Sequence, residues 1–255
     1  MLRFLAAPQT WQQRKRDPAK AFILHLNCTD INPFTPHKFW QEVLKLLQDK
    51  AAGERSLQSV INEVLSGEPP LENRDLRRVL RQIGQQNKFL LLLLDDYDAA
   101  LRPNQNYTEA EMLGFLNAFR NLAVHSDELG SYFRTIVATS RKLNELGPKL
   151  TPSGSPWYNQ YLFRALTPFS EDDVTILFNR MPQQWALTPA QQAGIREISD
   201  RHPALLQNAC YLLFETLREN KELAAEAFAR DFANATEQFF RYTNTSANYE
   251  KLKEG

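Results

Sequence analysis

Cysteine is scarce in this sequence. Its 255 residues include two cysteines, Cys28 and Cys210, which lie far apart and outside any C-x-x-C spacing. Zinc sites and disulfide frameworks need clustered or regularly spaced cysteines, so the sequence indicates neither of them. We therefore expect reduced thiols and a cytoplasmic protein.

The sequence also has no net charge and no long hydrophobic run. Thirty basic residues balance thirty acidic ones, and the sequence pI is about 6.9. The overall charge therefore gives no attraction to nucleic acid or to an anionic membrane surface. The longest apolar run, from Phe89 to Leu94, is too short to cross a bilayer, so we expect no membrane partner.

What the sequence does contain is a run of five leucines that leads directly into Asp95 and Asp96. A short, wholly apolar run predicts a strand that is buried on both faces, as in the middle of a parallel sheet. Open α/β sheets bind their ligands at the carboxyl ends of the strands, where these carboxylates would lie. In P-loop ATPases this pattern is the Walker B strand, whose first acid holds Mg²⁺ and whose second positions the attacking water. The alternative is a core strand followed by a solvated turn.

The order of the expected elements indicates two units. Apolar segments predict strands at residues 21–27, 89–94, 133–138 and 161–165, with helices between them. Beyond them, cap residues and apolar stripes predict helices alone, beginning after Ser170, Thr188 and His202.

The fold class is therefore an α/β unit with a parallel sheet, followed by an all-α unit. We place the α/β core at residues 1–166, a helical unit at 167–243 and a polar tail at 244–255.

A second cluster of polar residues follows the strand expected at 133–138. Thr139, Ser140 and Arg141 come directly after it. If this strand and the leucine strand are parallel neighbours, both clusters lie on one rim of the sheet. An acid pair for Mg²⁺, a hydroxyl that orients water or phosphate, and a guanidinium that meets phosphate charge together suit phosphoryl transfer. The alternative for Arg141 is an ordinary solvated loop.

Four segments in order resemble STAND-type ATPases, the AAA+-related switches of signalling and defence proteins. These segments read FLLLLLDDYDAAL, RTIVATSRKLNEL, SPWYNQYLFRALTPFSEDDVTILF and DRHPALLQNACYLLFE. In that family they correspond to Walker B, sensor 1, the entry to the fifth strand and the helical lid. The resemblance covers about residues 1–220.

This resemblance implies a role for each candidate residue. Asp95 would be the acid that organises Mg²⁺, and Asp96 would be the catalytic acid. Thr139, Ser140 and Arg141 would form the sensor that faces the γ-phosphate, while His202 and Pro203 would touch the nucleotide base from the lid. The implied cofactors are Mg²⁺ and ATP, and the implied partners are ATP or ADP together with a protein partner or a second copy of the chain.

One part of the family pattern is missing. The sequence contains no G-x-x-x-x-G-K-[ST], the Walker A loop whose backbone N–H groups and lysine hold the phosphates. Residues 2–8 resemble the end of the helix that follows this loop, so we expect a core that lacks its first strand and P-loop. Such a chain would bind ATP weakly or not at all and would hydrolyse it only if the P-loop were supplied upstream. The strands beside the missing one would keep unpaired backbone groups.

Two other functions remain open. The first is a degenerate, non-hydrolysing module that keeps the fold for protein interaction. The second is a nucleic-acid binder that uses the basic helix face formed by Arg74, Arg77, Arg78 and Arg81. An ordinary solvated face accounts for these arginines better, because the net charge is zero and no aromatic residues alternate with them.

Overall fold

The structure of the chain is a computed structural model that describes residues 2–67, 70–71, 73–123, 131–148, 156–183, 186–219 and 225–242. It divides into two compact units, Met1–Phe163 and Arg164–Gly255. The helices of the first unit are α1 (Leu2–Ala6), α2 (Pro8–Gln13), α3 (Pro36–Lys50), α4 (Arg55–Leu65), α5 (Asn73–Gln85) and α6 (Glu109–Ala123). Its strands are β1 (Ala21–Asn27), β2 (Phe89–Asp95) and β3 (Phe133–Val137). The second unit contains α7 (Glu171–Asn179), α8 (Pro189–Ser199), α9 (Pro203–Arg218) and α10 (Ala225–Tyr242).

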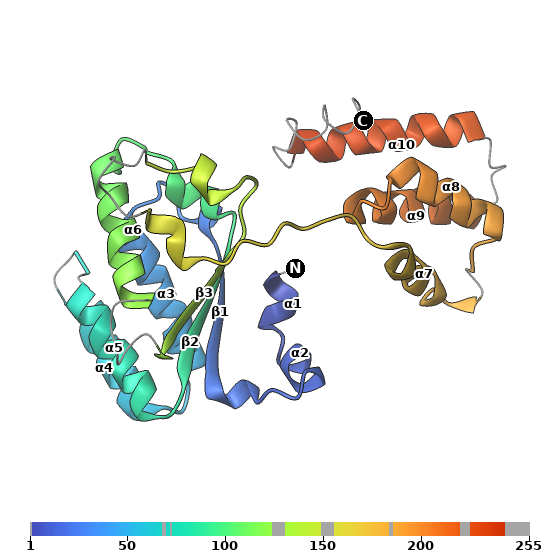
Figure 1. The fold of residues 1–255 in the computed structure, drawn as a ribbon. Helices are drawn as coiled ribbons and strands as arrows, with labels where there is room; N and C mark the ends of the chain where they lie inside the picture. Colours follow the sequence, from blue (N-terminus) through green and yellow to red (C-terminus); the bar gives the residue numbers. More distant parts are fainter. Residues whose placement is uncertain are drawn as a thin grey trace. The chain divides into compact units, whose positions relative to one another are not determined.

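The three strands form one parallel sheet in the order β1-β2-β3 (Figure 1). The leucine run is the central strand, as predicted: Leu92 pairs with Leu24 on one side and with Thr135 on the other. Residues 90–94 are each at most 7% exposed. A continuous apolar run suits this position because both faces of the strand are covered.

The two faces of the sheet are covered unequally. Alternate residues such as Leu90, Leu92 and Leu94 point into the main core, which they share with α3, α4, α5 and α6. The residues between them, Leu91 and Leu93, point the other way and pack with Leu2, Leu5 and Trp11 of α1 and α2. Figure 1 shows α1 and α2 on the side of the sheet opposite α3–α6.

Strand β3 lies at an edge of the described sheet. Ile136 is opposite Leu93 on the face that α1 covers, and it is 39% exposed. The N–H of Leu90 donates to the Tyr132 carbonyl and the N–H of Ala138 donates to the Leu94 carbonyl, so even-numbered residues of β3 face β2. The backbone groups of Thr135 and Val137 consequently point away from β2, and within the described residues no hydrogen bond to them is found.

The predicted strand at 161–165 is wrong. These residues form neither strand nor helix, and Leu162 is 79% exposed. An apolar segment becomes a strand only when a neighbouring strand supplies hydrogen bonds, and no described strand lies beside this one. The compact units divide after Phe163, whereas the sequence placed the domain boundary after residue 166.

The second unit consists of helices, and its helix starts agree with the sequence. Ser170 and Thr188 each accept a hydrogen bond from the backbone N–H three residues later, and each forms a reciprocal capping box. The helices enclose a separate apolar core that includes Val174, Leu206 and Leu213. The predicted tail at 244–255 lies outside the described residues. Among the helices described in either unit, none combines the length and apolarity that a membrane crossing requires.

Candidate functional site

The two polar clusters predicted from the sequence lie at the same edge of the sheet. Because β2 and β3 are parallel neighbours, Asp95 and Asp96 leave the sheet beside the residues that follow β3. Two hydrogen bonds extend the pairing beyond the strands: the N–H of Ala138 donates to the Leu94 carbonyl at 2.8 Å, and the N–H of Tyr97 donates to the Ala138 carbonyl at 3.0 Å. The segment 139–141 therefore begins at a point that is fixed against the end of β2.

Asp96 has an unusual backbone conformation, and its side chain contacts a residue from β1. Its φ of 46° lies in the left-handed region, which aspartate adopts more readily than most residues. Asn27 Nδ2 donates to Asp96 Oδ2 at 2.9 Å. Asn27 Oδ1 in turn accepts hydrogen bonds from the N–H of Thr29 at 2.9 Å and from its hydroxyl at 2.7 Å. These bonds fix the orientation of the Asn27 amide, so its N–H₂ group points at Asp96.

Asp95 is the more enclosed of the two acids. Its side chain is 38% exposed, and its Oδ2 lies 3.6 Å from His25 Nε2. Asp95 also pairs in register with Asn27, so the end of β1 lies directly beside it. Its second oxygen, Oδ1, makes no hydrogen bond to any residue that the structure describes. One oxygen of Asp95 and one of Asp96 are thus free to meet a ligand.

The donor set at this edge fits Mg²⁺ in part. Carboxylate oxygens are the protein ligands that Mg²⁺ prefers, and the ion usually keeps several waters and binds substrate phosphates as well. Within the described ranges, no three His, Cys, Asp or Glu side chains form a group that could hold an ion by themselves. Asp95 and Asp96 could therefore hold Mg²⁺ only together with oxygens from water or from a phosphate.

A third acid, Asp98, is part of the same edge. It lies in the 3-10 turn Tyr97–Leu101 and is 8% exposed. Its Oδ2 accepts from the N–H of Ser140 at 3.1 Å, and its Oδ1 accepts from the Ser140 hydroxyl at 2.6 Å. The hydroxyl of Thr139 donates to the Arg141 carbonyl at 2.7 Å, which folds the segment back on itself. Arg141 itself is exposed.

Sequence reasoning missed the roles of Asn27 and Asp98. Both residues act through partners that are remote in the sequence, Asp96 and Ser140 respectively. A signal was present for each of them. Asn27 is the polar residue that ends the strand predicted at 21–27, and Asp98 is an acid placed just after the Asp95-Asp96 pair.

The thiol beneath this edge is not reactive. Cys28 is fully buried, and its pKa is raised to about 12, first by burial and then by the negative charges of Asp96 and Asp95. A thiol with this pKa stays protonated at neutral pH, and the thiolate is the nucleophilic form.

The two lid residues predicted from the sequence belong to the second unit. His202 precedes α9 as its N-cap residue, and Pro203 is the first residue of that helix. Burial lowers the pKa of His202, so its neutral form is favoured near neutral pH.

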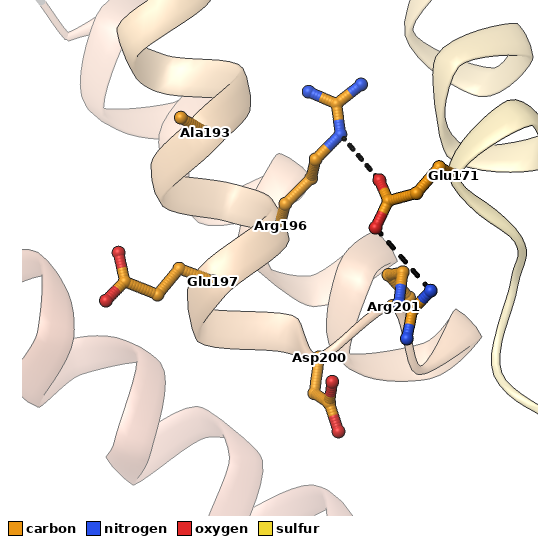
Figure 2. A pocket seen from close by; sticks show the side chains of 6 residues that line it. All are labelled: Glu171, Ala193, Arg196, Glu197, Asp200 and Arg201. Atoms are coloured by element: carbon orange, nitrogen blue, oxygen red, sulfur yellow. Dashed lines mark ion pairs between the residues drawn. The ribbon is translucent and has the colours of Figure 1, made fainter.

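A pocket of about 540 Å³ is lined by residues that precede His202 in the sequence, but neither His202 nor Pro203 lines it (Figure 2). Glu171 forms two ion pairs there, with Arg196 Nε and with Arg201 Nη1, both at 3.5 Å. Glu197 and Asp200 also line the pocket. The pocket is lined by two arginines and three acids, so it has no net attraction for an anion. We interpret its ion pairs as contacts that stabilise the packing of the helices.

Comparisons with known proteins give a fold and no family. No protein-family model matches the chain, and no curated protein matches it. Among solved structures, the chain is similar to the Walker-type ATPase paby2304 of Pyrococcus abyssi, with a TM-score of 0.54 and 18% sequence identity. The match covers 91% of this chain and 64% of that protein. At this identity the likeness shows the fold alone, an α/β architecture with a parallel sheet.

Proposed function

We propose that the chain is the nucleotide-binding region and helical lid of a STAND-type, AAA+-related ATPase that acts as a signalling switch. The observation that carries this proposal is the hydrogen-bonded edge at which Asp95 and Asp96 lie next to the segment 139–141. The likeness to a Walker-type ATPase supports the fold that this function requires. In such a switch, bound ATP would bias two conformations.

Each residue at the edge has a role in this proposal. Bound Mg²⁺ would neutralise charge on the β- and γ-phosphates. Asp95 would hold that ion together with water and phosphate oxygens, and Asp96 would orient the attacking water. Asn27 keeps Asp96 in place through the 2.9 Å hydrogen bond. Arg141, which is exposed and follows the anchored Ser140, would meet the negative charge of the phosphate.

The phosphates also need a cradle that residues 1–255 do not encode, because no Walker A sequence occurs among them. We infer that a further strand, followed by a glycine-rich loop, pairs with the edge of β3 that no described strand occupies. The support is the outward-pointing backbone of Thr135 and Val137 and the partly exposed Ile136. Without this strand the triphosphate lacks most of its N–H contacts, so ATP binding by residues 1–255 is weak or absent.

Calorimetric titration with Mg²⁺-ATP tests the proposal on two proteins. One is residues 1–255, and the other is the same chain preceded by a strand and a G-x-x-x-x-G-K-[ST] loop. We expect measurable affinity in the longer protein alone, and a loss of about tenfold or more from Asp95→Ala. Asp49→Ala is the matched control, because Asp49 is an exposed carboxylate near the end of α3. Equal losses from both substitutions, or no binding by the longer protein, would contradict the proposal.

A second candidate is a non-hydrolysing module that binds another protein through the same fold. The absence of a Walker A sequence and the open edge of β3 favour it. Partner binding that survives Asp96→Ala and Arg141→Ala would support this candidate over the ATPase. The nucleic-acid function has less support, because Arg78 is paired with both carboxylate oxygens of Glu63, at 2.6 and 2.5 Å.

A further inference from the structure

Ser140 is already engaged by protein groups. Its backbone N–H and its hydroxyl donate to the two oxygens of a single carboxylate, Asp98. Asp98 is 8% exposed, so the carboxylate is largely withdrawn from water and both of its oxygens are occupied by Ser140. A bidentate contact of this kind fixes both the position and the orientation of the serine.

This contact changes which group of segment 139–141 can be expected to bind a phosphate. A hydroxyl that donates to a buried carboxylate at 2.6 Å is not free to donate to a phosphate. The Thr139 hydroxyl is also engaged, since it donates to the Arg141 carbonyl at 2.7 Å. The exposed guanidinium of Arg141 is therefore the group of this segment that is left to meet a ligand.

We propose that Asp98 is a positioning residue that holds Arg141 in place through Ser140. This inference rests on the proposed nucleotide site and assigns Ser140 an anchoring role in place of phosphate contact. Asp98 lies two residues after Asp96 in the sequence, so one short turn carries both the acid that faces the ligand and the acid that anchors the arginine. Movement of that turn shifts Asp96 and Arg141 together.

The alternative is that the Asp98 contact only stabilises the fold. A structural role predicts that Asp98→Ala weakens the protein without a specific effect on Arg141. A positioning role predicts that Asp98 and Ser140 depend on each other, and that the effect of Asp98 on ligand binding vanishes when Arg141 is absent. Double-mutant cycles distinguish the two roles, because residues that act as a unit have non-additive effects.

The first experiment needs no nucleotide and uses residues 1–255. Hydrogen exchange of the segment 138–142 is compared among the parent chain, Asp98→Ala, Ser140→Ala and the double variant. We expect exchange about tenfold faster in each single variant, with little further change in the double variant. Asp98→Asn should keep slow exchange, because its carbonyl oxygen still accepts the Ser140 N–H. Ser59→Ala, at an exposed serine on α4, is the matched control.

Additive effects of Asp98→Ala and Ser140→Ala on exchange would overturn the inference. So would slow exchange at 138–142 in Asp98→Ala. The result does not depend on whether the chain binds ATP, so the anchoring contact is tested separately from the proposed function.

The second experiment uses the longer protein that carries a strand and P-loop. We expect Asp98→Ala to weaken Mg²⁺-ATP binding about tenfold in the parent protein and to have almost no effect when Arg141→Ala is already present. Asp98→Asn should restore most of the affinity. A tenfold loss that persists without Arg141 would show that Asp98 does not act through it. Absence of binding by the longer protein would refute the proposed function, while the exchange result would still decide the anchoring role of Asp98.

Discussion

Strands β2 and β3 lie side by side but have different surroundings. Strand β2 pairs on both edges and is buried on both faces, and Leu92, Leu93 and Leu94 have no exposed area. Strand β3 pairs on one edge, and its burial alternates from Phe133, which is 1% exposed, to Ile136, which is 39% exposed. The comparison shows that β2 is complete within the described sheet, whereas β3 has an edge and part of a face that can still accept a neighbour.

The largest expected difference between the two strands comes from truncating one apolar side chain in each. Leu92→Ala removes a fully buried side chain from the middle of the core and should lower the free energy of unfolding by about 2–5 kcal/mol. Ile136→Ala removes a side chain that already meets water, so it should cost less than about 1 kcal/mol. Urea denaturation measures both values. Similar losses at the two positions would contradict the assignment of β3 to an open edge.

Proline substitutions test the free edge through the backbone. The N–H of Ile136 faces β2, so Ile136→Pro removes a bond of the ladder and should cost about 3 kcal/mol. The N–H of Val137 points away from β2, so Val137→Pro should cost about 1 kcal/mol or less. Thermal unfolding of residues 1–255 measures the difference. If a further strand pairs with β3 in a longer protein, Val137→Pro should become as costly there as Ile136→Pro.

A smaller effect is expected at the ligand edge. Asn27→Asp keeps the acceptor for Thr29 and replaces the N–H₂ donor to Asp96 with a second negative charge. The free energy of unfolding should fall by about 1 kcal/mol near neutral pH, and millimolar Mg²⁺ should recover part of it. Gln13→Glu, at an exposed position of α2, is the control and should change little. Equal behaviour of the two variants with and without Mg²⁺ would show that Asn27 does not orient Asp96.

The smallest effects concern two of the capping boxes, Thr108–Glu111 in the first unit and Ser170–Asp173 in the second. Hydrogen bonds from Thr108 lower the pKa of Glu111, and hydrogen bonds from Ser170 lower the pKa of Asp173. A carboxyl whose pKa is lower in the folded state stabilises the fold above its unfolded pKa and loses that contribution as the pH falls through the folded value. Glu111→Gln and Asp173→Asn should therefore reduce thermal stability slightly near neutral pH, and the difference from the parent should vanish below about pH 3. A difference that grows in acid would contradict this assignment.

The two strands and the polar residues at their carboxyl ends could be predicted from the sequence, because each strand is recognisable from its own residues. A run of five leucines can be buried on both faces only in a central strand, and the residues that follow it must lie at the carboxyl edge. The strand before Thr139 is recognisable in the same way. Parallel pairing of the two strands was a topological expectation, and the register of Leu94 with Val137 agrees with it.

Contacts between residues that are remote in the sequence could not be predicted. Asn27 meets Asp96 and Asp98 meets Ser140 only because the sheet brings the strand ends together. The failed strand at 161–165 has the same origin, since its apolar character is local but a strand needs a partner, and no described strand pairs with it. The pairing of Arg78 with Glu63 likewise joins two helices, so the basic face looked more open in the sequence than it is.

The central claim is that Asp95, Asp96 and the segment 139–141 form one site for a divalent cation and phosphate. NMR of residues 1–255 during addition of Mn²⁺ tests it directly, because the ion broadens the signals of nearby amides. The account predicts broadening at both 95–98 and 139–141, at the same Mn²⁺ concentration, and loss of both effects in Asp95→Ala but not in Asp49→Ala. Broadening at 95–98 that leaves Ser140 and Arg141 unaffected, or that survives Asp95→Ala, would contradict it.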